Sequence, residues 1–182
     1  MKIETTPLKD CFIIHDTIIK DSRGYFFESF NKRKFNELTN IDIDFVQDNQ
    51  SQSSKGVLRG LHYQKDMYAQ AKLVRVLKGK VLDIAVDLRK NSPTFGQHFA
   101  VELSEDNNLQ FFIPRGFAHG FIVLSDETIF FYKCDNYYNK EYDTGIKYND
   151  PTLQINWLLK EEEIIVSEKD ANLPLFKDAV YF

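Results

Sequence analysis

The chain has 182 residues with 43% hydrophobic and 14% aromatic side chains, which suits one domain with a sizeable core and excludes a disordered chain. The formal net charge of -4 argues against a general nucleic-acid-binding surface. No apolar run approaches the length of a membrane span, and the residues after Met1 lack the hydrophobic segment of a signal peptide.

Predicted strands dominate the first half of the chain, because β-branched and aromatic residues cluster between turn-forming ones. In chain order we predict a strand at 11–19, a turn at 21–24, an aromatic strand at 25–30, a helix at 31–38 capped by Asn31, a strand at 43–50 and a polar turn at 51–55. A strand at 56–64 follows.

The second half continues in the same manner. Strands are predicted at 70–77, 80–88, 97–103, 109–113, 117–124 and 128–135. Lys78 and Gly79 predict a tight hairpin between the first two of these strands, and 125–127 is expected to join the last two as another pair. About ten short strands at this spacing predict an antiparallel sandwich or barrel. Residues 160–182 are expected to wrap the outside, with helix confined to 31–38 and short pieces after residue 150.

The stretch 56–64 alternates like a strand but places a charge and a titratable ring among apolar residues. Burying a charge is costly unless it is paired or used, and histidine titrates near neutral pH. Arg59 and His62 have opposite parity, so a regular strand would send them to opposite faces. A β-bulge near Gly60 would bring both to one face, and a shared site requires it. The alternative is a surface arginine beside a satisfied core histidine.

Polar side chains recur inside the later apolar strands, at Lys72, Asp83, His119 and Tyr132. Asp83 lies on the polar face of its strand, opposite a face made of aliphatic residues. Polar groups that converge within one β-structure describe a pocket. Tyr132 taken alone is more typical of a core tyrosine with a bonded hydroxyl, so the pocket interpretation depends on the whole set.

Other kinds of site lack their sequence signatures. The four histidines show no paired metal-ligand spacing, and Gln64 stands where a second ligand two residues after His62 would be needed. No glycine-rich phosphate loop and no nucleophile elbow is present. We therefore expect no metal, and a site that works by acid–base and electrostatic means or merely binds. Cys11 and Cys134 form no disulfide framework, so we expect a cytoplasmic protein with free thiols.

Six segments in order carry a family resemblance: DSRGYFFE at 21–28, QDNQS at 47–51, GVLRGLHYQ at 56–64, QAKLV at 70–74, IPRGFAHGF at 113–121 and SEKD at 167–170. Together they resemble the nucleotide-sugar 3,5-epimerases typified by dTDP-4-dehydrorhamnose 3,5-epimerase, over nearly the whole chain. The resemblance implies one domain over 1–182 with a mainly β fold, the cupin-type double-stranded antiparallel β-barrel (jelly roll). It also implies a homodimer with exchanged N-terminal strands.

The resemblance implies roles for individual residues. It makes His62 the general base, Asp170 its partner and Tyr132 the general acid, and it places Lys72 at the sugar carbonyl. Asp83, on its polar strand face, ranks second as the group that holds the His62 ring. Contacts with the substrate are implied for Arg23, Phe26, Glu28, Gln47, Asn49, Arg59, His119, Tyr138, Asp143 and Lys169.

Two positions depart from the family pattern. Asp143 stands where glutamate is expected and is one methylene shorter, and Lys140 stands where proline is usual. The segment after Gln64 has no close match either. Without the resemblance, the outer residues would be interpreted as ordinary surface ion pairs and turn residues, namely Arg23, Glu28, Lys169, Gln47 and Asn49.

The implied chemistry needs these residue types. In a 4-keto sugar carried by a nucleoside diphosphate, the carbonyl acidifies the hydrogens on C3 and C5, so no cofactor is needed. Removal of either hydrogen by a base gives an enolate, and return of a proton to the opposite face inverts the carbon. An ammonium group at the carbonyl oxygen stabilises the enolate more than the ketone, and arginines neutralise the diphosphate.

Alternatives stay open on the residues alone. We expect conversion of dTDP-4-dehydro-6-deoxyglucose to dTDP-4-dehydrorhamnose, but another nucleotide sugar such as a GDP-4-keto-heptose, or inversion at C3 only, is the nearest variant. A non-catalytic sugar-nucleotide-binding cupin would need the pocket without its acid–base pair. A metal-dependent cupin isomerase or oxygenase would need a bound metal.

Overall fold

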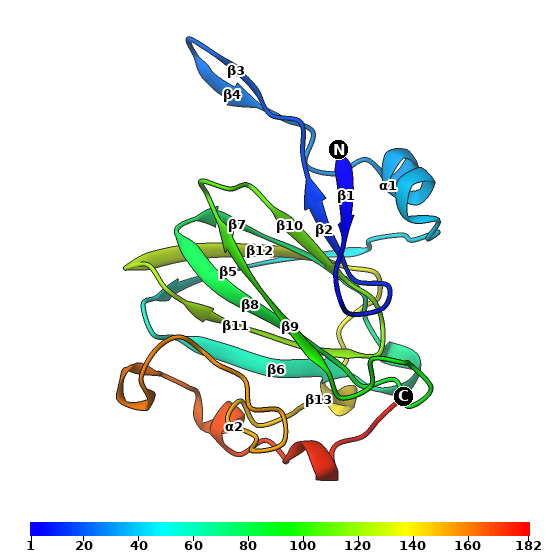
Figure 1. Ribbon diagram of the computed structural model, residues 1–182, viewed down its shortest axis with the longest axis vertical. Helices are drawn as coiled ribbons and strands as arrows, with labels where there is room; N and C mark the ends of the chain where they lie inside the picture. The colour runs from blue at the N-terminus through cyan, green and yellow to red at the C-terminus, as the bar shows by residue number, and fades with distance from the viewer.

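Two antiparallel sheets face each other in the computed structural model, which describes residues 1–182 (Figure 1). The six-stranded sheet has the order β1 (Lys2–Thr5), β2 (Phe12–His15), β10 (Gln110–Ile113), β7 (Lys72–Lys78), β12 (Glu127–Cys134) and β5 (Gln47–Ser54). The five-stranded sheet has the order β13 (Asp143–Gly145), β6 (Leu58–Gln64), β11 (Phe117–Val123), β8 (Lys80–Asp87) and β9 (His98–Ser104). The predicted antiparallel jelly-roll barrel is confirmed.

Helices are few and short. They are α1 (Lys32–Thr39), α2 (Glu168–Ala171) and the 3-10 turns η1 (Asp66–Tyr68), η2 (Lys140–Tyr142), η3 (Glu161–Glu163) and η4 (Phe176–Asp178). As predicted, Asn31 caps α1, because its side chain accepts a hydrogen bond from the Lys34 N–H at 3.2 Å. Two of the 3-10 turns lie between α1 and residue 150, where no helix was predicted. None of the helices has the length and apolar character needed to cross a membrane.

Two predicted strand pairs are wrong. β7 and β8, joined at Lys78 and Gly79, lie in opposite sheets instead of forming a hairpin, and so do β11 and β12. In this fold most successive strands alternate between the sheets, so most strands take at least one ladder partner from a distant part of the chain, although β1 pairs with β2 and β8 with β9. Gly79 has φ +80°, which serves a turn between sheets as well as a hairpin turn. The turn residues therefore predicted where β7 ends and β8 begins, but not which strands these two pair with.

β5 is as long as the predicted strand at 43–50 but lies four residues later, so it includes most of the expected polar turn at 51–55. It pairs with β12 along its whole length, from Gln47 opposite Cys134 to Ser54 opposite Glu127. Its polar side chains alternate between the barrel interior and the outer surface, which a strand that lines a polar pocket requires. The high serine and glutamine content concealed the strand, because such residues are usually enriched in turns.

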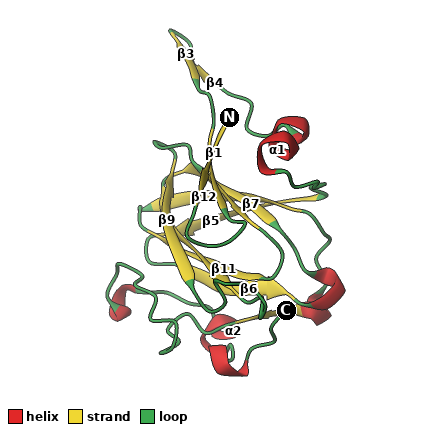
Figure 2. Cartoon of the chain, turned by 45° about the vertical axis from the view of Figure 1, so that its right-hand side comes forward, coloured by secondary structure: helices red, strands yellow, loops and turns green.

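Residues 19–26, near the N-terminus, form a separate projection. The predicted strand at 11–19 is divided into β2 and β3 (Ile19–Asp21), and the aromatic strand is shortened to β4 (Gly24–Phe26). β3 and β4 pair only with each other, and their hairpin extends away from both sheets (Figure 1 and Figure 2). A two-stranded hairpin without a packed face is marginally stable on its own.

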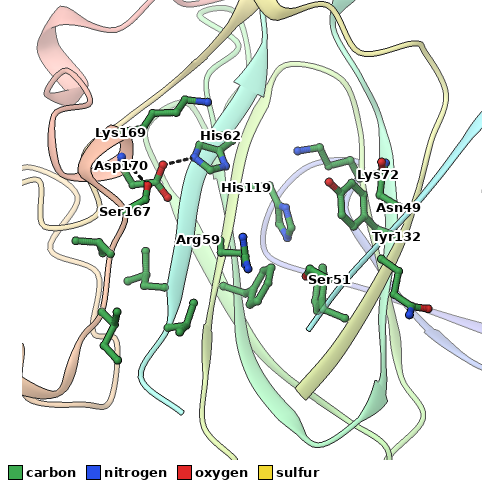
Figure 3. Close-up of a pocket in the computed structure, with 17 residues that line it drawn as sticks. Asn49, Ser51, Arg59, His62, Lys72, His119, Tyr132, Ser167, Lys169 and Asp170 are labelled. Atoms are coloured by element: carbon green, nitrogen blue, oxygen red, sulfur yellow. Dashed lines mark hydrogen bonds and ion pairs between the residues drawn. The ribbon is translucent and has the colours of Figure 1, made fainter. Parts of the chain in front are cut away.

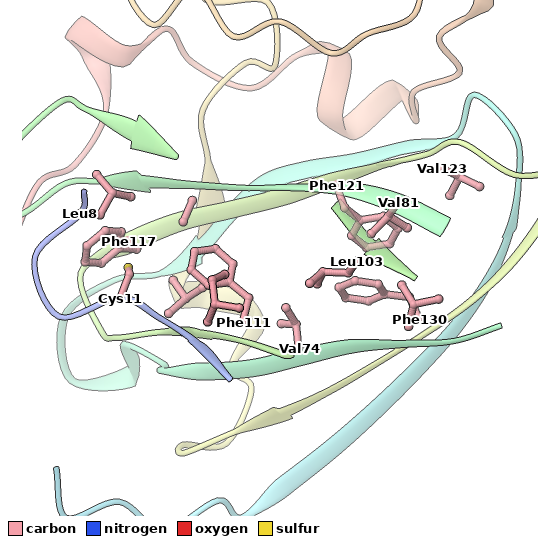
Figure 4. Close-up of a cluster of buried hydrophobic side chains, with 14 residues drawn as sticks. Leu8, Cys11, Val74, Val81, Leu103, Phe111, Phe117, Phe121, Val123 and Phe130 are labelled. Carbon is pink, nitrogen blue, oxygen red and sulfur yellow. The ribbon is translucent and has the colours of Figure 1, made fainter. Parts of the chain in front are cut away.

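Three apolar clusters hold the layers together. The first lies between the two sheets, where Phe121 of β11 stacks on Phe130 of β12 with 4.0 Å between ring centroids (Figure 4). The second lies between the outer face of the five-stranded sheet and the C-terminal segment 146–182. The third packs Phe35 of α1 against the six-stranded sheet. The aliphatic face predicted for β8 is thus covered by the C-terminal segment, and its polar face turns inward.

A buried carboxylate ties the N-terminal loop to the segment after β8. Asp87 is fully buried and accepts hydrogen bonds at 2.5–2.9 Å from three side chains, those of Arg89, Ser92 and Thr94. Arg89 also reaches Asp10, before β2, at 2.9 Å. Burial raises the pKa of Asp87, but the hydrogen bonds outweigh it and hold that pKa below its usual range.

Asp87→Asn is expected to lower the free energy of unfolding at pH 7 by about 2–4 kcal/mol, because it leaves the Arg89 guanidinium without its buried partner. The folded chain depresses the pKa of Asp87, so this stabilisation is present above the ordinary aspartate pKa of about 4 and is lost as the pH falls below it. Urea unfolding at a series of pH values measures the difference, with the exposed Asp126→Asn as control. If the difference in unfolding free energy between wild type and Asp87→Asn stays the same at acid pH, the ionised Asp87 carboxylate is not the source of the stabilisation.

Candidate functional site

A cavity of about 610 Å³ lies between the two sheets and is called the main cavity below. A second cavity of about 360 Å³, the side cavity, adjoins it and shares five of its lining residues. Of the predicted site residues, the main cavity is lined by Asn49, Arg59, His62, Lys72, His119, Tyr132, Lys169 and Asp170 (Figure 3). The side cavity adds Gln47, Tyr138 and Asp143.

A histidine–carboxylate pair forms one wall of the main cavity. The Nε2 atom of His62, on β6, lies 2.8 Å from Oδ1 of Asp170, on α2 (Figure 3). The backbone N–H of Asp170 donates to Ser167, the N-cap of α2, at 3.1 Å. Burial raises the pKa of Asp170, but its hydrogen bonds, with His62 first, hold that pKa below its usual range. Asp170 is therefore a carboxylate that orients the ring and leaves Nδ1 of His62 available to a substrate.

The break required at Gly60 is present. Gly60 has φ +126°, and the register of β6 against β11 shifts at this point. A Cβ at this position would lie 2.6 Å from Cα of Gly120, so the two glycines let the strands approach closely. The irregularity brings Arg59 and His62 to the same cavity despite their opposite parity.

The opposite wall belongs to the six-stranded sheet. Lys72 of β7 and Tyr132 of β12 face His62 across the cavity, and the Lys72 ammonium lies 6.0 Å from the centre of the Tyr132 ring (Figure 3). Burial raises the pKa of Tyr132 to about 12, so its hydroxyl keeps its proton at neutral pH and can donate it. Burial lowers the pKa of Lys72, and its charge acts from a wall with little water to screen it.

A second histidine–carboxylate pair lies deeper. The Nε2 atom of His119, on β11, lies 3.0 and 2.9 Å from the two carboxylate oxygens of Asp83, on β8. Both residues are buried, which raises the pKa of Asp83 and lowers that of His119. The alternative that Asp83 holds the His62 ring is therefore wrong, because Asp83 is bonded to His119 and Asp170 occupies the position beside His62.

The side cavity has a wall fixed by its own hydrogen bonds. One oxygen of Asp143 accepts from the Tyr138 hydroxyl at 3.3 Å and from the Lys169 ammonium. The backbone N–H of Tyr138 donates to Gln47 at 3.0 Å, and the amide of Gln47 donates to Asn49 at 3.0 Å. These residues, from three separate parts of the chain, therefore form one connected polar surface.

Three predicted contact residues lie away from both cavities, on the β3–β4 hairpin and just after it. The Arg23 side chain is 88% exposed and pairs with Asp21 at 2.5 Å. Phe26 is 69% exposed. Glu28 pairs with Lys34 of α1 at 2.8 Å. Within one chain, the structure does not bring these residues to the site.

Three further polar residues support the site and were given no role from the sequence. Ser53 on β5 accepts a hydrogen bond from Nε of Arg59 at 3.1 Å. Ser167 caps α2, and the buried Gln64 donates to Asp143 at 3.2 Å. The Ser-x-x-Asp spacing that begins at Ser167 is a helix N-cap signal that could have identified it. The Ser53–Arg59 contact crosses between successive strands of opposite sheets, and the Gln64–Asp143 contact joins residues 79 apart in the chain, so neither has a local signal.

The arrangement is suited to proton transfer. A base and a protonated phenol face each other, and an ammonium group stands beside the phenol. The structure contains no cluster of three or more histidine, cysteine or acidic side chains placed to hold a metal ion. Each cavity histidine instead uses one ring nitrogen on a carboxylate.

Known proteins match the chain along its length. The profile of the family described as dTDP-4-dehydrorhamnose 3,5-epimerase matches residues 5–178. A dTDP-4-dehydrorhamnose 3,5-epimerase from Shigella flexneri is 49% identical over 100% of this chain and 99% of its own. The crystal structure of one from Elizabethkingia anophelis superposes with a TM-score of 0.96 at 58% identity, covering 100% of this chain and 99% of that one. The dTDP-6-deoxy-D-glucose-3,5-epimerase of Legionella pneumophila, in complex with dTDP-4-keto-L-rhamnose, superposes with a TM-score of 0.93 at 50% identity, covering 97% and 93%.

Gly60→Ala is expected to lower the free energy of unfolding by about 2–4 kcal/mol, because the new methyl group meets the β11 backbone in addition to the strained φ. Gly24→Ala is the matched control, since Gly24 has φ +128° but no atom within 4 Å of its Cβ position. Urea unfolding gives the loss of unfolding free energy in both variants, and the extra loss in Gly60→Ala measures the cost of the clash between β6 and β11. Equal losses in the two variants would show that only backbone strain matters.

Proposed function

Because the chain belongs to the dTDP-4-dehydrorhamnose 3,5-epimerase family, isomerases that act on nucleotide sugars, we propose that it converts dTDP-4-dehydro-6-deoxyglucose to dTDP-4-dehydrorhamnose. The observation that carries the proposal is that His62 and Tyr132 stand on facing walls of one cavity (Figure 3). Inversion of a carbon by proton transfer needs a base on one face of the sugar and an acid on the other. The two sheets supply one group each.

His62 is the base of the proposed mechanism. Its Nδ1 atom removes the proton from C3 or C5, while Asp170 holds Nε2 and stabilises the imidazolium that forms. The electron pair of the broken C–H bond moves into the carbonyl, which gives an enolate with negative charge on its oxygen. The Lys72 ammonium stabilises this charge, and loss of such a group typically costs on the order of 10²-fold in rate.

Tyr132 completes the inversion by donating its hydroxyl proton to the opposite face of the same carbon. The carbonyl is regenerated, and the imidazolium and the tyrosinate then return to their starting forms by proton exchange with water. The net reaction is an isomerisation that consumes no co-reactant and introduces one solvent hydrogen at each inverted carbon. His119, oriented by Asp83, lines the same cavity, which supports a role for it as a further contact to the sugar.

The nucleotide is placed toward the remaining polar groups. Arg59, held by Ser53, is suited to the diphosphate, because its guanidinium pairs with phosphate oxygens through two parallel hydrogen bonds. The polar wall of the side cavity, with Tyr138 and Lys169, is suited to the nucleoside. The Legionella pneumophila relative, crystallised with dTDP-4-keto-L-rhamnose, supports thymidine as the nucleoside.

A homodimer belongs to the proposal, because one chain leaves part of the expected site unfilled. Arg23, Phe26 and Glu28 lie on or beside a hairpin that projects from the two sheets (Figure 2). None of the three lines either cavity of its own chain. The hairpin also exposes Ile19 and Tyr25, and exposed apolar surface of this kind marks a site of association. In the dimer the hairpin of one chain brings Arg23 to the diphosphate and Phe26 to the base at the site of its partner.

Deuterium wash-in tests the function. With dTDP-4-dehydro-6-deoxyglucose in D₂O, the wild-type chain is expected to exchange the C3 and C5 hydrogens, which mass spectrometry follows. His62→Ala should slow exchange at both carbons by about 10²–10⁴-fold, because the base is removed, with nearly unchanged dTDP affinity. Tyr132→Phe should retain proton removal at one or both carbons but impair inversion, because the acid is removed.

The exposed Gln97→Ala is the control and should behave as wild type. Exchange that survives in His62→Ala would show that another group is the base, and full epimerisation by Tyr132→Phe would exclude the phenol as the acid. Exchange confined to C3 would favour an enzyme that inverts C3 only. Exchange only with a GDP-linked 4-keto sugar would show that the substrate carries guanosine instead of thymidine. A wild-type chain that exchanges no 4-keto sugar of dTDP, UDP, GDP or CDP would favour the non-catalytic binding cupin.

Mixed dimers test the crossing of the hairpin. Arg23→Ala and His62→Ala chains, each impaired alone, are to be co-expressed with two different affinity tags. If the hairpin crosses, each mixed dimer contains one site with both changes and one intact site, so a random mixture recovers about a quarter of the sites. The rate at substrate concentrations below KM measures the recovery. No recovery in purified mixed dimers would show that each hairpin serves its own chain.

A further inference from the structure

The side cavity contains a glutamine that bridges two of its elements. Gln64, the last residue of β6, is only 3% exposed. Its Oε1 accepts the backbone N–H of Asn139 at 2.8 Å, and its Nε2 donates to Oδ1 of Asp143 at 3.2 Å. A buried amide with both ends bonded has one preferred orientation, because any rotation leaves a polar atom unsatisfied. Gln64 therefore fixes the 138–143 segment against the strand that carries His62.

Asp143 has little bonding capacity left for a ligand. Its Oδ2 accepts from the Tyr138 hydroxyl and from the Lys169 ammonium, while Oδ1 accepts from Gln64. A carboxylate has about four acceptor positions, and three of those of Asp143 are used within the protein. The side chain is 13% exposed, so it lies behind Lys169, whose side chain is 56% exposed.

The charges in this wall also indicate that Asp143 does not contact the nucleotide itself. A free carboxylate in this wall would repel a nucleoside diphosphate, whereas the Asp143–Lys169 pair is neutral as a unit. The hydrogen bond from Lys169 to Asp143 raises the pKa of the ammonium, so the cation persists at neutral pH. Tyr138, half exposed, presents its ring to the side cavity while its hydroxyl is held by the carboxylate.

We propose that Asp143 and Gln64 are positioning residues that hold the Tyr138 ring and the Lys169 ammonium in place, and that these two groups, not Asp143, contact the nucleotide. The inference rests on the proposed function and deepens it, because it assigns nucleotide affinity to a wall separate from the acid–base pair. It replaces the expectation from the sequence that Asp143 is itself a substrate contact.

A mutant cycle tests the assignment, with dTDP binding measured by isothermal titration calorimetry. In the wild-type background, Asp143→Asn is expected to raise the Kd for dTDP about tenfold, the effect of losing one charge-assisted hydrogen bond. In the Tyr138→Phe/Lys169→Met background the same change should no longer raise Kd and should lower it, because the groups that Asp143 positions are gone and its unpaired carboxylate repels the diphosphate. A full tenfold effect in both backgrounds would mean that Asp143 contacts the nucleotide directly and would overturn the inference.

Gln64 variants supply the second measurement. Gln64→Ala should raise both the Kd for dTDP and KM about tenfold while kcat changes by less than about twofold, and Gln97→Ala should change neither. Gln64→Glu keeps the acceptor for the Asn139 N–H but sets a second carboxylate against Asp143. This variant should therefore lose more dTDP affinity than Gln64→Ala. A merely structural role would reduce the fraction of active protein, seen as lower kcat at unchanged Kd, and would overturn the inference.

The two proposals fail in different ways. If the wild-type protein binds dTDP and exchanges the sugar hydrogens, but Asp143→Asn has the same effect on Kd in both backgrounds, only the positioning roles are refuted. Wild-type protein that binds no dTDP would refute the proposed function and this inference with it. Binding without exchange would refute the epimerase mechanism alone, because the cycle depends only on nucleotide affinity.

Discussion

The irregular approach of β6 to β11 at Gly60 is the constraint on which the rest of the site depends. Two glycines, Gly60 and Gly120, let the strands approach more closely than side chains would allow. The freed N–H of Gly60 donates to the Asp170 carboxylate at 3.2 Å, and the same carboxylate holds His62. One local departure from regular pairing thus turns Arg59 and His62 to the same cavity and fixes the group that orients the base.

The two sheets divide the chemistry between them. The five-stranded sheet supplies both histidine–carboxylate pairs, with Asp170 delivered by the C-terminal segment that covers its outer face. The six-stranded sheet supplies Lys72 and Tyr132. Because the apolar cluster between the sheets sets their separation, the distance between His62 and Tyr132, the proposed base and acid, follows from core packing (Figure 4). The catalytic geometry is therefore stabilised by the same contacts that stabilise the fold.

In the proposed mechanism, the groups that bind the nucleotide are separate from the acid–base pair. The side cavity is organised by contacts among its own residues, with Asp143 at their centre and Gln64 as the link to β6. The projecting hairpin carries Arg23 and Phe26, which lie away from both cavities of their own chain and, in the proposed dimer, serve the site of the partner. Affinity can therefore change at either place while His62 and its partner stay fixed.

Most of the candidate site residues were implied by a family resemblance. The sequence by itself determined the β class, the helix capped by Asn31 and the need for a break at Gly60. These features follow from parity, capping and backbone preference, which act over a few neighbouring residues. Only the tertiary structure decided which strands pair, that Asp170 and not Asp83 holds His62, and which residues lie outside the site of their own chain. Parity assigns a side chain to a face, but the strand beside it is chosen by packing between distant segments, and no local pattern contains that information.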